Sequence, residues 1–383
     1  MKNAELKEWI IKQAQDIGID KIGFTHAGSF EHLRQSIEDQ QANKRNSGFE
    51  HKNLDERLNP NLIFDNPKTI IAIAVAYPSK ITDKPENKGK EKRGKFARAS
   101  WGVDYHDILK EKMDLLITKL REKTAGQYAF LSMVDTGALI DVAVAARAGI
   151  GFIGKNGLLI TEEFGSWVFL GEIVTDLEFP PDEEIPNGCG ECTRCITACP
   201  TGALMGDGRL NAKKCLSYQS QTKNVLPDEF RKKLKTQIYG CDICQTSCPY
   251  NKGKDFHLHE EMEPVFEDVQ PVLEDLLVMS NKEFKERFSY MAGSWRGKKP
   301  LQRNALIALA NSNARNSLPL IWQVAKEDVR PEIVATAIWT IGQLTRSWTD
   351  ELKEEFAHVA KRLDSPIVQE EYDKVLSLDR YSE

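Results

Sequence analysis

The sequence of 383 residues lacks the features that mark several large protein classes. It has no apolar run near the roughly 20 residues that a membrane-spanning helix needs, and no charged segment followed by a short apolar run opens it. Its formal net charge of -5 gives no global signature of a nucleic-acid-binding protein, although a local basic face would still attract phosphate. We therefore expect a cytoplasmic protein without a membrane partner.

Cysteine is absent from most of the chain, because all eight cysteines lie between positions 189 and 248. In a reducing compartment such crowding favours metal ligation over disulfides. The glycine-rich run GIGFIGKNG at 149–157 neither opens a helix after a strand nor contains G-K-[ST], so it gives only weak support to a nucleotide site.

The part of the chain before the cysteines alternates helical and strand-like patterns. Apolar residues recur at helical spacing in 5–18 and 107–123, and a further helix is expected at 138–149. The charged segment 78–94 is expected to form a surface loop. We interpret residues 1–180 as an α/β layer domain. Apolar runs predict strands at 20–24, 69–77, 128–134 and 166–174.

The cysteine spacing matches that of bacterial two-cluster ferredoxins. Residues 189–200 read C-x2-C-x2-C-x3-C-P, a run whose fourth cysteine binds the other cluster. Residues 241–249 read C-x2-C-x3-C-P, and Cys215 supplies the missing member. Crossing the fourth ligands predicts two 4Fe-4S clusters, one on Cys189, Cys192, Cys195 and Cys248 and the other on Cys199, Cys215, Cys241 and Cys244. The alternatives are a zinc ribbon, which needs neither the third close cysteine nor the prolines, and a set of buried thiols.

A ferredoxin pair only moves electrons, so we expect the bond-breaking chemistry in the first domain. Asp135 stands where the strand at 128–134 ends and a helix follows, a position where open α/β sheets bind ligands. The alternative is that Asp135 caps a helix that begins near Ala138.

The tail after residue 258 has a different character. The segments 303–311 and 334–342 share a small, apolar helical pattern, which indicates either a helical repeat or two ordinary amphipathic helices. Basic and aromatic residues alternate in 285–303, a combination that suits phosphate contacts and base stacking, although a charge run is usually a solvated face. A second basic group lies at 223–235. The candidate contacts to a nucleic acid are Lys223, Arg231, Lys232, Lys233, Arg296, Lys298, Lys299 and Arg303.

Several motifs in the same order resemble the epoxyqueuosine reductase family, the cobalamin-dependent iron-sulfur enzymes that complete queuosine synthesis in tRNA. The resemblance rests on VDTGALID (134–141), AARAGIGFIGKNGLLI (145–160), SWVFLGEI (166–173), both cysteine sets and YGCDICQTSCPYNK (239–252). It implies an α+β multidomain fold with three parts. These are a nitroreductase-like α/β cobalamin domain (1–180), a ferredoxin-like two-cluster domain (181–258) and a C-terminal HEAT-like α-helical domain (259–383).

The resemblance also implies the roles of particular residues. Asp135 is the acid that protonates the leaving epoxide oxygen, and burial is expected to raise its pKa, while Asp141 is expected to be structural. No D-x-H-x-x-G segment occurs, so cobalamin is expected to bind without a histidine ligand. The implied contacts to cobalamin are Arg57, Ala97, Arg98, Asp135, Ser217 and Asp242.

Three hypotheses follow from these observations. The first is a cobalamin-dependent reductase that acts on epoxyqueuosine in tRNA as a monomer, with an external low-potential electron donor of the flavodoxin or ferredoxin type. The second is an electron-transfer module that docks on a separate reductase, which would have no use for an acid in a large α/β domain. The third is a cobalamin reductase acting on a small molecule, similar to reductive dehalogenases, which would not need a basic helical tail.

Overall fold

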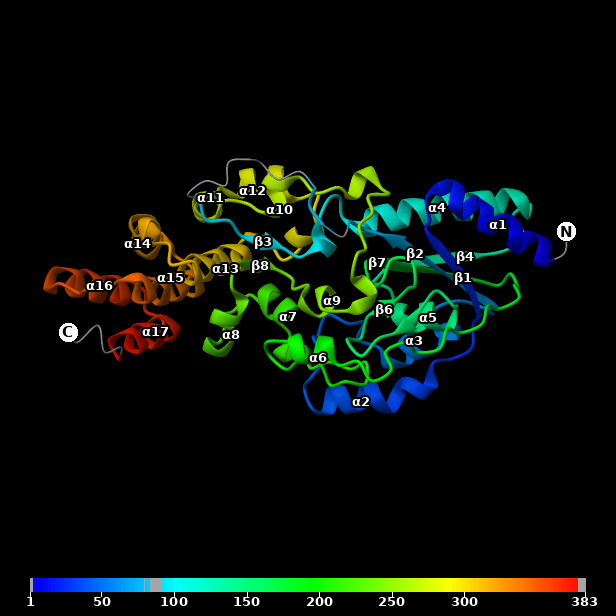
Figure 1. The fold of residues 1–383 in the computed structure, drawn as a ribbon, viewed down its shortest axis with the longest axis horizontal. Helices are drawn as coiled ribbons and strands as arrows, with labels where there is room; N and C mark the ends of the chain where they lie inside the picture. Colours follow the sequence, from blue (N-terminus) through cyan, green and yellow to red (C-terminus); the bar gives the residue numbers. More distant parts are fainter. Residues whose placement is uncertain (1–2, 79, 83–90, 378–383) are drawn as a thin grey trace. The chain divides into compact units, whose positions relative to one another are not determined.

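The computed structural model of the protein describes residues 3–78, 80–82 and 91–377 (Figure 1). Residues 79 and 83–90 of the expected loop therefore lie outside the described residues. The chain forms two compact units, each built from segments that are distant in sequence. No helix in these described ranges is long and apolar enough to cross a membrane. Unit 1 contains Met1–Lys80, Gly102–Cys215 and Asp242–Glu263, and unit 2 contains Ile81–Trp101, Leu216–Cys241 and Pro264–Glu383. The division at residues 180 and 258 stays a prediction.

Unit 1 is organised around a four-stranded sheet. Its strand order is β1-β2-β7-β4, and every neighbouring pair is antiparallel. All four predicted strands are confirmed, and β2 is buried along its whole length, as its continuous apolar run indicates. The strands are β1 (Lys21–His26), β2 (Thr69–Ala76), β4 (Phe130–Met133) and β7 (Val168–Thr175).

Helices cover both faces of this sheet (Figure 1). On one face lie α1 (Asn3–Ile17) and α4 (Tyr105–Lys123), and on the other lies α5 (Asp141–Arg147). The predicted apolar stripe of α4 is buried against the strands. Gly171 of β7 allows this close approach, because a Cβ there would lie 3.3 Å from the side chains of Leu109 and Met113. Glycine at 171 thus lets α4 pack directly against β7.

Shorter elements of unit 1 surround the cysteines. The hairpin of β5 (Phe152–Ile153) and β6 (Leu159–Ile160) carries the glycine-rich run. Helices α6 (Arg194–Ala198) and α9 (Ile243–Thr246) pack against each other, although the chain separates them by more than 40 residues. The remaining helices of this unit are α2 (Arg34–Ala42) and α3 (Leu54–Leu58).

Unit 2 is mostly helical, as predicted for the tail. A short parallel pair joins β3 (Lys95–Phe96) to β8 (Gln237–Tyr239). The two repeat-like segments lie in α13 (Lys298–Asn311) and α15 (Pro331–Leu344), which pack together and are almost fully buried. The other helices are α7 (Leu216–Gln221), α8 (Asp228–Leu234), α10 (Phe266–Val269), α11 (Leu273–Val278), α12 (Asn281–Phe288), α14 (Leu318–Glu327), α16 (Asp350–Arg362) and α17 (Pro366–Leu376).

Candidate functional site

Asp135 lies in the segment between β4 and α5. Its φ is 45°, a left-handed conformation that aspartate tolerates better than most residues, and its side chain is 60% exposed. Helix α5 begins only at Asp141 and has Ile140 at its N-cap, so the interpretation of Asp135 as a helix cap is wrong. Because the sheet is antiparallel, the rule for ligand sites in open parallel sheets does not explain the position of Asp135.

The first turn of α4 provides the partners of Asp135. The Tyr105 hydroxyl donates to Asp135 Oδ2 at 2.7 Å, and His106 Nε2 lies 3.6 Å from the same oxygen. His106 Nδ1 is 2.8 Å from Asp104 Oδ1, and Asp104 also caps α4. Tyr105 is held by stacking on Phe169, with ring centroids 4.3 Å apart. The result is an Asp104–His106–Asp135 chain with Tyr105 beside it.

Sequence reasoning missed Tyr105 and His106. The available signal was an aspartate at a helix start followed two residues later by a histidine, because a helix N-cap can orient such a side chain. Nothing in the sequence, however, indicates that this turn meets a residue 30 positions further along the chain.

The charges in this chain of residues set the pKa of Asp135. The neighbouring His106 lowers the pKa of Asp135, and this effect exceeds the opposing effect of burial. The expectation of a raised pKa is therefore wrong for this conformation. The hydrogen bond to Asp104, followed by the nearby carboxylate of Asp135, raises the pKa of His106 to about 9. At neutral pH the pair is an imidazolium and a carboxylate, and the proton is stored on His106.

Asp141, predicted to be structural, lies close to this site together with Glu172 of β7. Burial, followed by the negative charge of Asp141, raises the pKa of Glu172 well above its usual range. Burial likewise raises the pKa of Asp141 to about 6. The sequence prediction did not include Glu172.

The residues implied for cobalamin lie in both units. Arg57 of α3 and Asp242, which precedes α9, belong to unit 1 with Asp135, whereas Ala97, Arg98 and Ser217 belong to unit 2. The Arg57 guanidinium is half-buried, has no hydrogen-bond partner among the described residues, and burial lowers its pKa. A half-buried donor without a described partner fits the amide and phosphate oxygens of a cobalamin.

The four cysteines predicted to bind one cluster all belong to unit 1, and the thiols of Cys189, Cys192, Cys195 and Cys248 influence one another. The pKa of Cys195 is raised by burial and by the neighbouring thiols of Cys189 and Cys192. The pKa of Cys248 is raised by burial and by Cys189 and Cys195. The last cysteine of the second run therefore lies beside the first three of the first run. This donor set fits the crossed assignment of one 4Fe-4S cluster.

Lys155, which lies in the glycine-rich run, contacts the loop that carries Cys189 and Cys192. Its Nζ donates to the carbonyls of Gly190 and Cys192 at 2.7 and 3.1 Å, and its backbone N–H points to Cys189 Sγ at 3.4 Å. Another backbone N–H, that of Ala203, donates to Cys199 Sγ at 3.3 Å. The run thus holds a loop that carries two of the cysteines.

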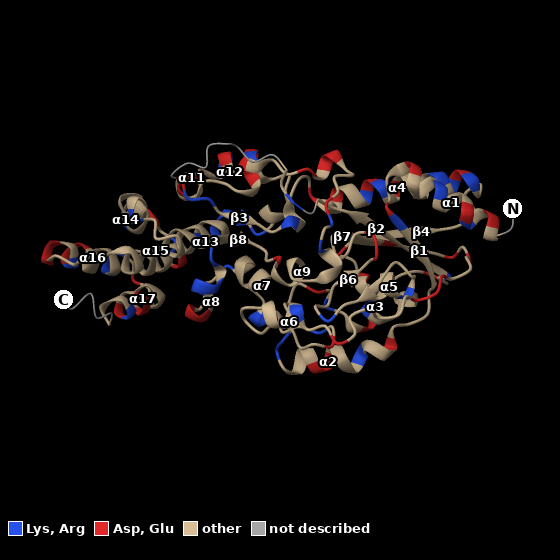
Figure 2. Cartoon of the chain, in the orientation of Figure 1, with Lys and Arg blue, Asp and Glu red and all other residues tan. Residues whose placement is uncertain are grey.

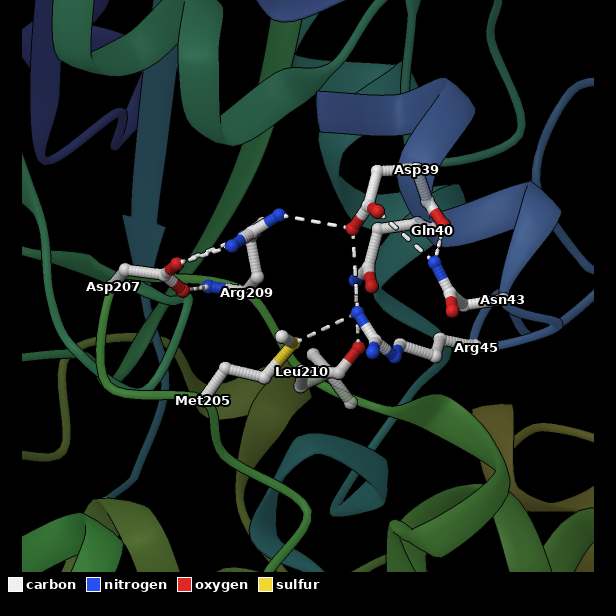
Figure 3. Close-up of polar contacts among 8 residues, drawn as sticks. All are labelled: Asp39, Gln40, Asn43, Arg45, Met205, Asp207, Arg209 and Leu210. Atoms are coloured by element: carbon white, nitrogen blue, oxygen red, sulfur yellow. Dashed lines mark hydrogen bonds and ion pairs between the residues drawn. The ribbon is translucent and has the colours of Figure 1, made fainter. Parts of the chain in front are cut away.

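A group of polar contacts joins the segment between Cys199 and Cys215 to α2 (Figure 3). Arg209 bonds both Asp207, at 2.7 Å, and Asp39 of α2, at 3.2 Å. Gln40 donates to the carbonyl of Leu210 at 2.8 Å. These contacts restrain residues 207–210, which lead to Cys215.

Two of the candidate tRNA contacts are buried in unit 2. Arg231 is 2% exposed and makes two 2.7 Å bonds to Glu371 of α17. Arg303 is 1% exposed and donates to carbonyls of residues 219–224. Neither guanidinium is available to phosphate, so the prediction is wrong for these two residues. An amphipathic pattern alone did not distinguish a buried arginine from an exposed one.

The other candidate cations differ in availability. Lys299 pairs with Glu332 at 2.9 Å, Lys298 donates to the carbonyl of Met279 at 2.6 Å, and Arg296 donates to that of Gln221 at 3.1 Å. In contrast, Lys223 and Lys232 are exposed and Lys233 is partly exposed, and none has an ion-pair partner in the described ranges. Figure 2 shows the basic end of α8 that carries Lys232 and Lys233.

These features define an iron-sulfur protein with an acid-base site in an α+β unit. A family model for a 4Fe-4S double cluster binding domain matches residues 188–251, and one described as epoxyqueuosine reductase QueG, DUF1730 matches residues 57–136. The chain is 56% identical over 339 residues to the epoxyqueuosine reductase of Lactococcus garvieae, covering 88% of this chain and 96% of that protein. It is 52% identical over 340 residues to that of Bacillus subtilis, covering 89% and 88%. The chain belongs to the epoxyqueuosine reductase family.

Solved structures agree with this assignment. An epoxyqueuosine reductase in complex with a stem loop of epoxyqueuosine-modified tRNA-Tyr superposes with a TM-score of 0.94 at 48% identity, over 98% of this chain and 99% of that one. The Bacillus subtilis enzyme, at 47% identity and with the same TM-score and coverage, has been solved with an aspartate catalytic loop swung out of the active site.

The cluster assignment predicts the iron content. The anaerobically reconstituted protein is expected to bind about eight irons, because two 4Fe-4S clusters use all eight cysteines. Cys248→Ala should reduce this to about four, since it removes one ligand of the first cluster only. Ser247→Ala is the matched control and should retain the wild-type iron content. Four or fewer irons in the wild-type protein would contradict the two-cluster assignment.

Proposed function

We propose that this protein reduces epoxyqueuosine to queuosine at the wobble position of tRNA, with cobalamin and two 4Fe-4S clusters as cofactors. The observation that carries the proposal is Asp135, held by Tyr105 and by a protonated His106 in the unit that also gathers four cluster thiols. A pure electron carrier has no use for such an acid-base site.

The reaction removes the epoxide oxygen as water, which requires two electrons and two protons. His106 passes its stored proton to Asp135, 3.6 Å away, and Asp135, whose side chain is exposed at the site, donates that proton to the departing oxygen. Asp104 stabilises the imidazolium until that transfer, and the second proton comes from solvent. Tyr105 holds the Asp135 carboxyl in one orientation.

Cobalamin, when bound, supplies the two-electron reducing power at the substrate, and its proposed contacts are Arg57, Ala97, Arg98, Asp135, Ser217 and Asp242. Arg57 fits this role best, because its half-buried guanidinium has no other partner among the described residues. The second cluster is proposed on Cys199, Cys215, Cys241 and Cys244. An external low-potential donor of the flavodoxin or ferredoxin type supplies the electrons to a monomeric enzyme in the cytoplasm.

The direct test is turnover. Anaerobically reconstituted protein, cobalamin and a chemical reductant are incubated with tRNA that contains epoxyqueuosine, and the nucleosides are analysed by mass spectrometry. Loss of one oxygen from the modified nucleoside is the expected result, dependent on both cobalamin and reductant. An unchanged nucleoside in the presence of intact clusters and bound cobalamin would refute the proposed function.

Unit 2 is proposed to bind the tRNA through its exposed cations. Lys223, Lys232 and Lys233 have no ion-pair partner among the described residues, and Trp295 is 51% exposed with Arg296 over its ring at 4.8 Å. An exposed aromatic ring near cations suits stacking of an unpaired base. The helical repeats of a HEAT-like domain are the proposed framework for this surface.

Binding to tRNA is expected to weaken steeply with salt, because contacts to phosphate release counterions. Changing Lys223, Lys232 and Lys233 together to glutamine should flatten the plot of log affinity against log salt by about 0.7 to 0.9 per contacting lysine. The matched control changes Lys12, Lys110 and Lys119 of unit 1, with the same loss of charge. An equal effect of the two triple variants would show that net charge, and not this surface, attracts the tRNA.

A further inference from the structure

The turn between β5 and β6 presents Lys155. The N–H groups of Gly154 and Gly157 donate to the carbonyls of Leu158 and Gly154, both at 2.9 Å, and close the hairpin. Gly157 has a φ of 81°, and a Cβ there would lie 2.7 Å from the carbonyl of Gly208. Glycine is therefore required at 157 for the turn that places Lys155.

Lys155 contacts the cysteine loop 189–192 with both its backbone and its side chain. Its backbone N–H points to Cys189 Sγ at 3.4 Å, and its Nζ donates to the carbonyls of Gly190 and Cys192 at 2.7 and 3.1 Å. In the described part of the chain, no carboxylate lies within ion-pair distance of this Nζ. The positive charge is thus held against the cysteine loop by carbonyls and is not neutralised by an acid.

Further contacts keep the hairpin and the cysteines together. Asn187 donates to the carbonyl of Ile153 at 2.7 Å and accepts the N–H of Cys189 at 2.9 Å. Phe152 of β5 and Cys248 belong to one apolar cluster, against which Cys189 packs. The hairpin that carries Lys155 therefore contacts cysteines of both runs, and these cysteines are predicted to bind the same cluster.

Positive charge and N–H···S bonds at the ligands raise the reduction potential of an iron-sulfur cluster, because reduction adds one negative charge to the cluster and its thiolates. Lys155 supplies a charge and such a bond at the same loop. Its side chain is only partly exposed, so water and salt screen this charge less than they screen a fully exposed one.

We propose that Lys155 raises the reduction potential of the cluster on Cys189, Cys192, Cys195 and Cys248. The inference rests on the cluster assignment within the proposed function, and not on the reaction with tRNA. The step that it favours is the transfer of one electron from a reductant to the cluster, in which no bond is formed or broken. Lys155 touches no substrate, and its effect is to make this cluster a better acceptor for the electrons of an external donor.

A redox titration of the anaerobically reconstituted full-length protein tests this role, with the reduced clusters followed by electron paramagnetic resonance. Lys155→Gln keeps a donor toward the two carbonyls but removes the charge. The potential of one cluster should therefore fall. At a fixed solution potential the ratio of reduced to oxidised cluster should decrease by roughly tenfold, which is about 59 mV for a one-electron couple. The iron content should equal that of the wild-type protein.

Three further proteins separate the charge of Lys155 from general loosening. Lys155→Arg keeps the charge and the donors, so its potential should stay close to that of the wild-type protein. Lys110→Gln removes the same charge from an exposed position on α4 and should leave both potentials unchanged. In Cys248→Ala, which is expected to retain only the second cluster, adding Lys155→Gln should not change the remaining potential.

Unchanged potentials in Lys155→Gln at full iron content would overturn the proposal, as would an equal fall in Lys110→Gln or in the Cys248→Ala protein. Loss of iron in Lys155→Gln would overturn it as well, because Lys155 would then only hold the loop in place. A wild-type protein without the two clusters would refute the cluster assignment and this inference together. A protein that shows the shift and fails to reduce epoxyqueuosine would refute the proposed reaction alone.

Discussion

Asp135→Asn is expected to lower the single-turnover rate of epoxyqueuosine reduction by roughly a hundredfold or more, the usual contribution of a positioned general acid. Asparagine keeps the shape of the side chain and can accept the Tyr105 hydrogen bond, but it cannot carry a proton from His106 to the substrate. The variant should retain its iron content and its affinity for cobalamin. Chemically reduced protein is used, so that the electron donor does not limit the rate.

The pH dependence adds a second readout. Because the pKa of His106 is raised to about 9, the wild-type rate should be maintained up to that region and fall as the pH rises through it. Asp107→Asn, an exposed change in the first turn of α4, is the matched control and should leave the rate unchanged. A wild-type rate in Asp135→Asn would remove the proposed acid, while the fold and the clusters would stand.

Arg231→Met is expected to destabilise unit 2 by about 3 kcal/mol, the lower part of the range for removing one partner of a buried ion pair. The Arg231–Glu371 pair joins α8 to α17, and both side chains are at most 3% exposed. Loss of the guanidinium leaves the Glu371 carboxylate buried. Lys374, 3.0 Å from Glu371, remains as a partner and moderates the cost. The urea midpoint of helix unfolding, followed by circular dichroism, measures the effect.

The double variant tests whether the cost comes from the unpaired charge. Arg231→Met with Glu371→Leu removes both charges and should recover most of the lost stability, because apolar residues of similar volume replace buried pairs well. As a control, Lys282→Ala breaks an exposed pair with Glu286, which should change stability by about 0.5 kcal/mol or less. Equal losses in the single and double variants would mean that packing, and not charge, is responsible.

The tertiary structure corrected several predictions for a common reason. Arg231 and Arg303 lie in basic, helical stretches that are equally compatible with an exposed face, and only the packing of α8, α13 and α17 buries them. The α/β alternation was correct, but the strands pair in an antiparallel sheet, because the pairing partner of a strand is a long-range property. The position of Asp135 after a strand was enough to select it as a site residue, but the sequence did not predict its partners Tyr105 and His106.

The sequence by itself determined the elements whose signals are local. Cluster ligation depends on thiols a few residues apart and on proline after each run, so spacing was enough to predict the cysteine sets. Apolar periodicity was enough for the strands and for the stripe of α4. Only the tertiary structure decided the proton chemistry, because the pKa of a group depends on burial and on charges brought together from distant parts of the chain. Asp135 meets His106, and Asp141 meets Glu172, through the packing of α4 and α5 on the two faces of one sheet.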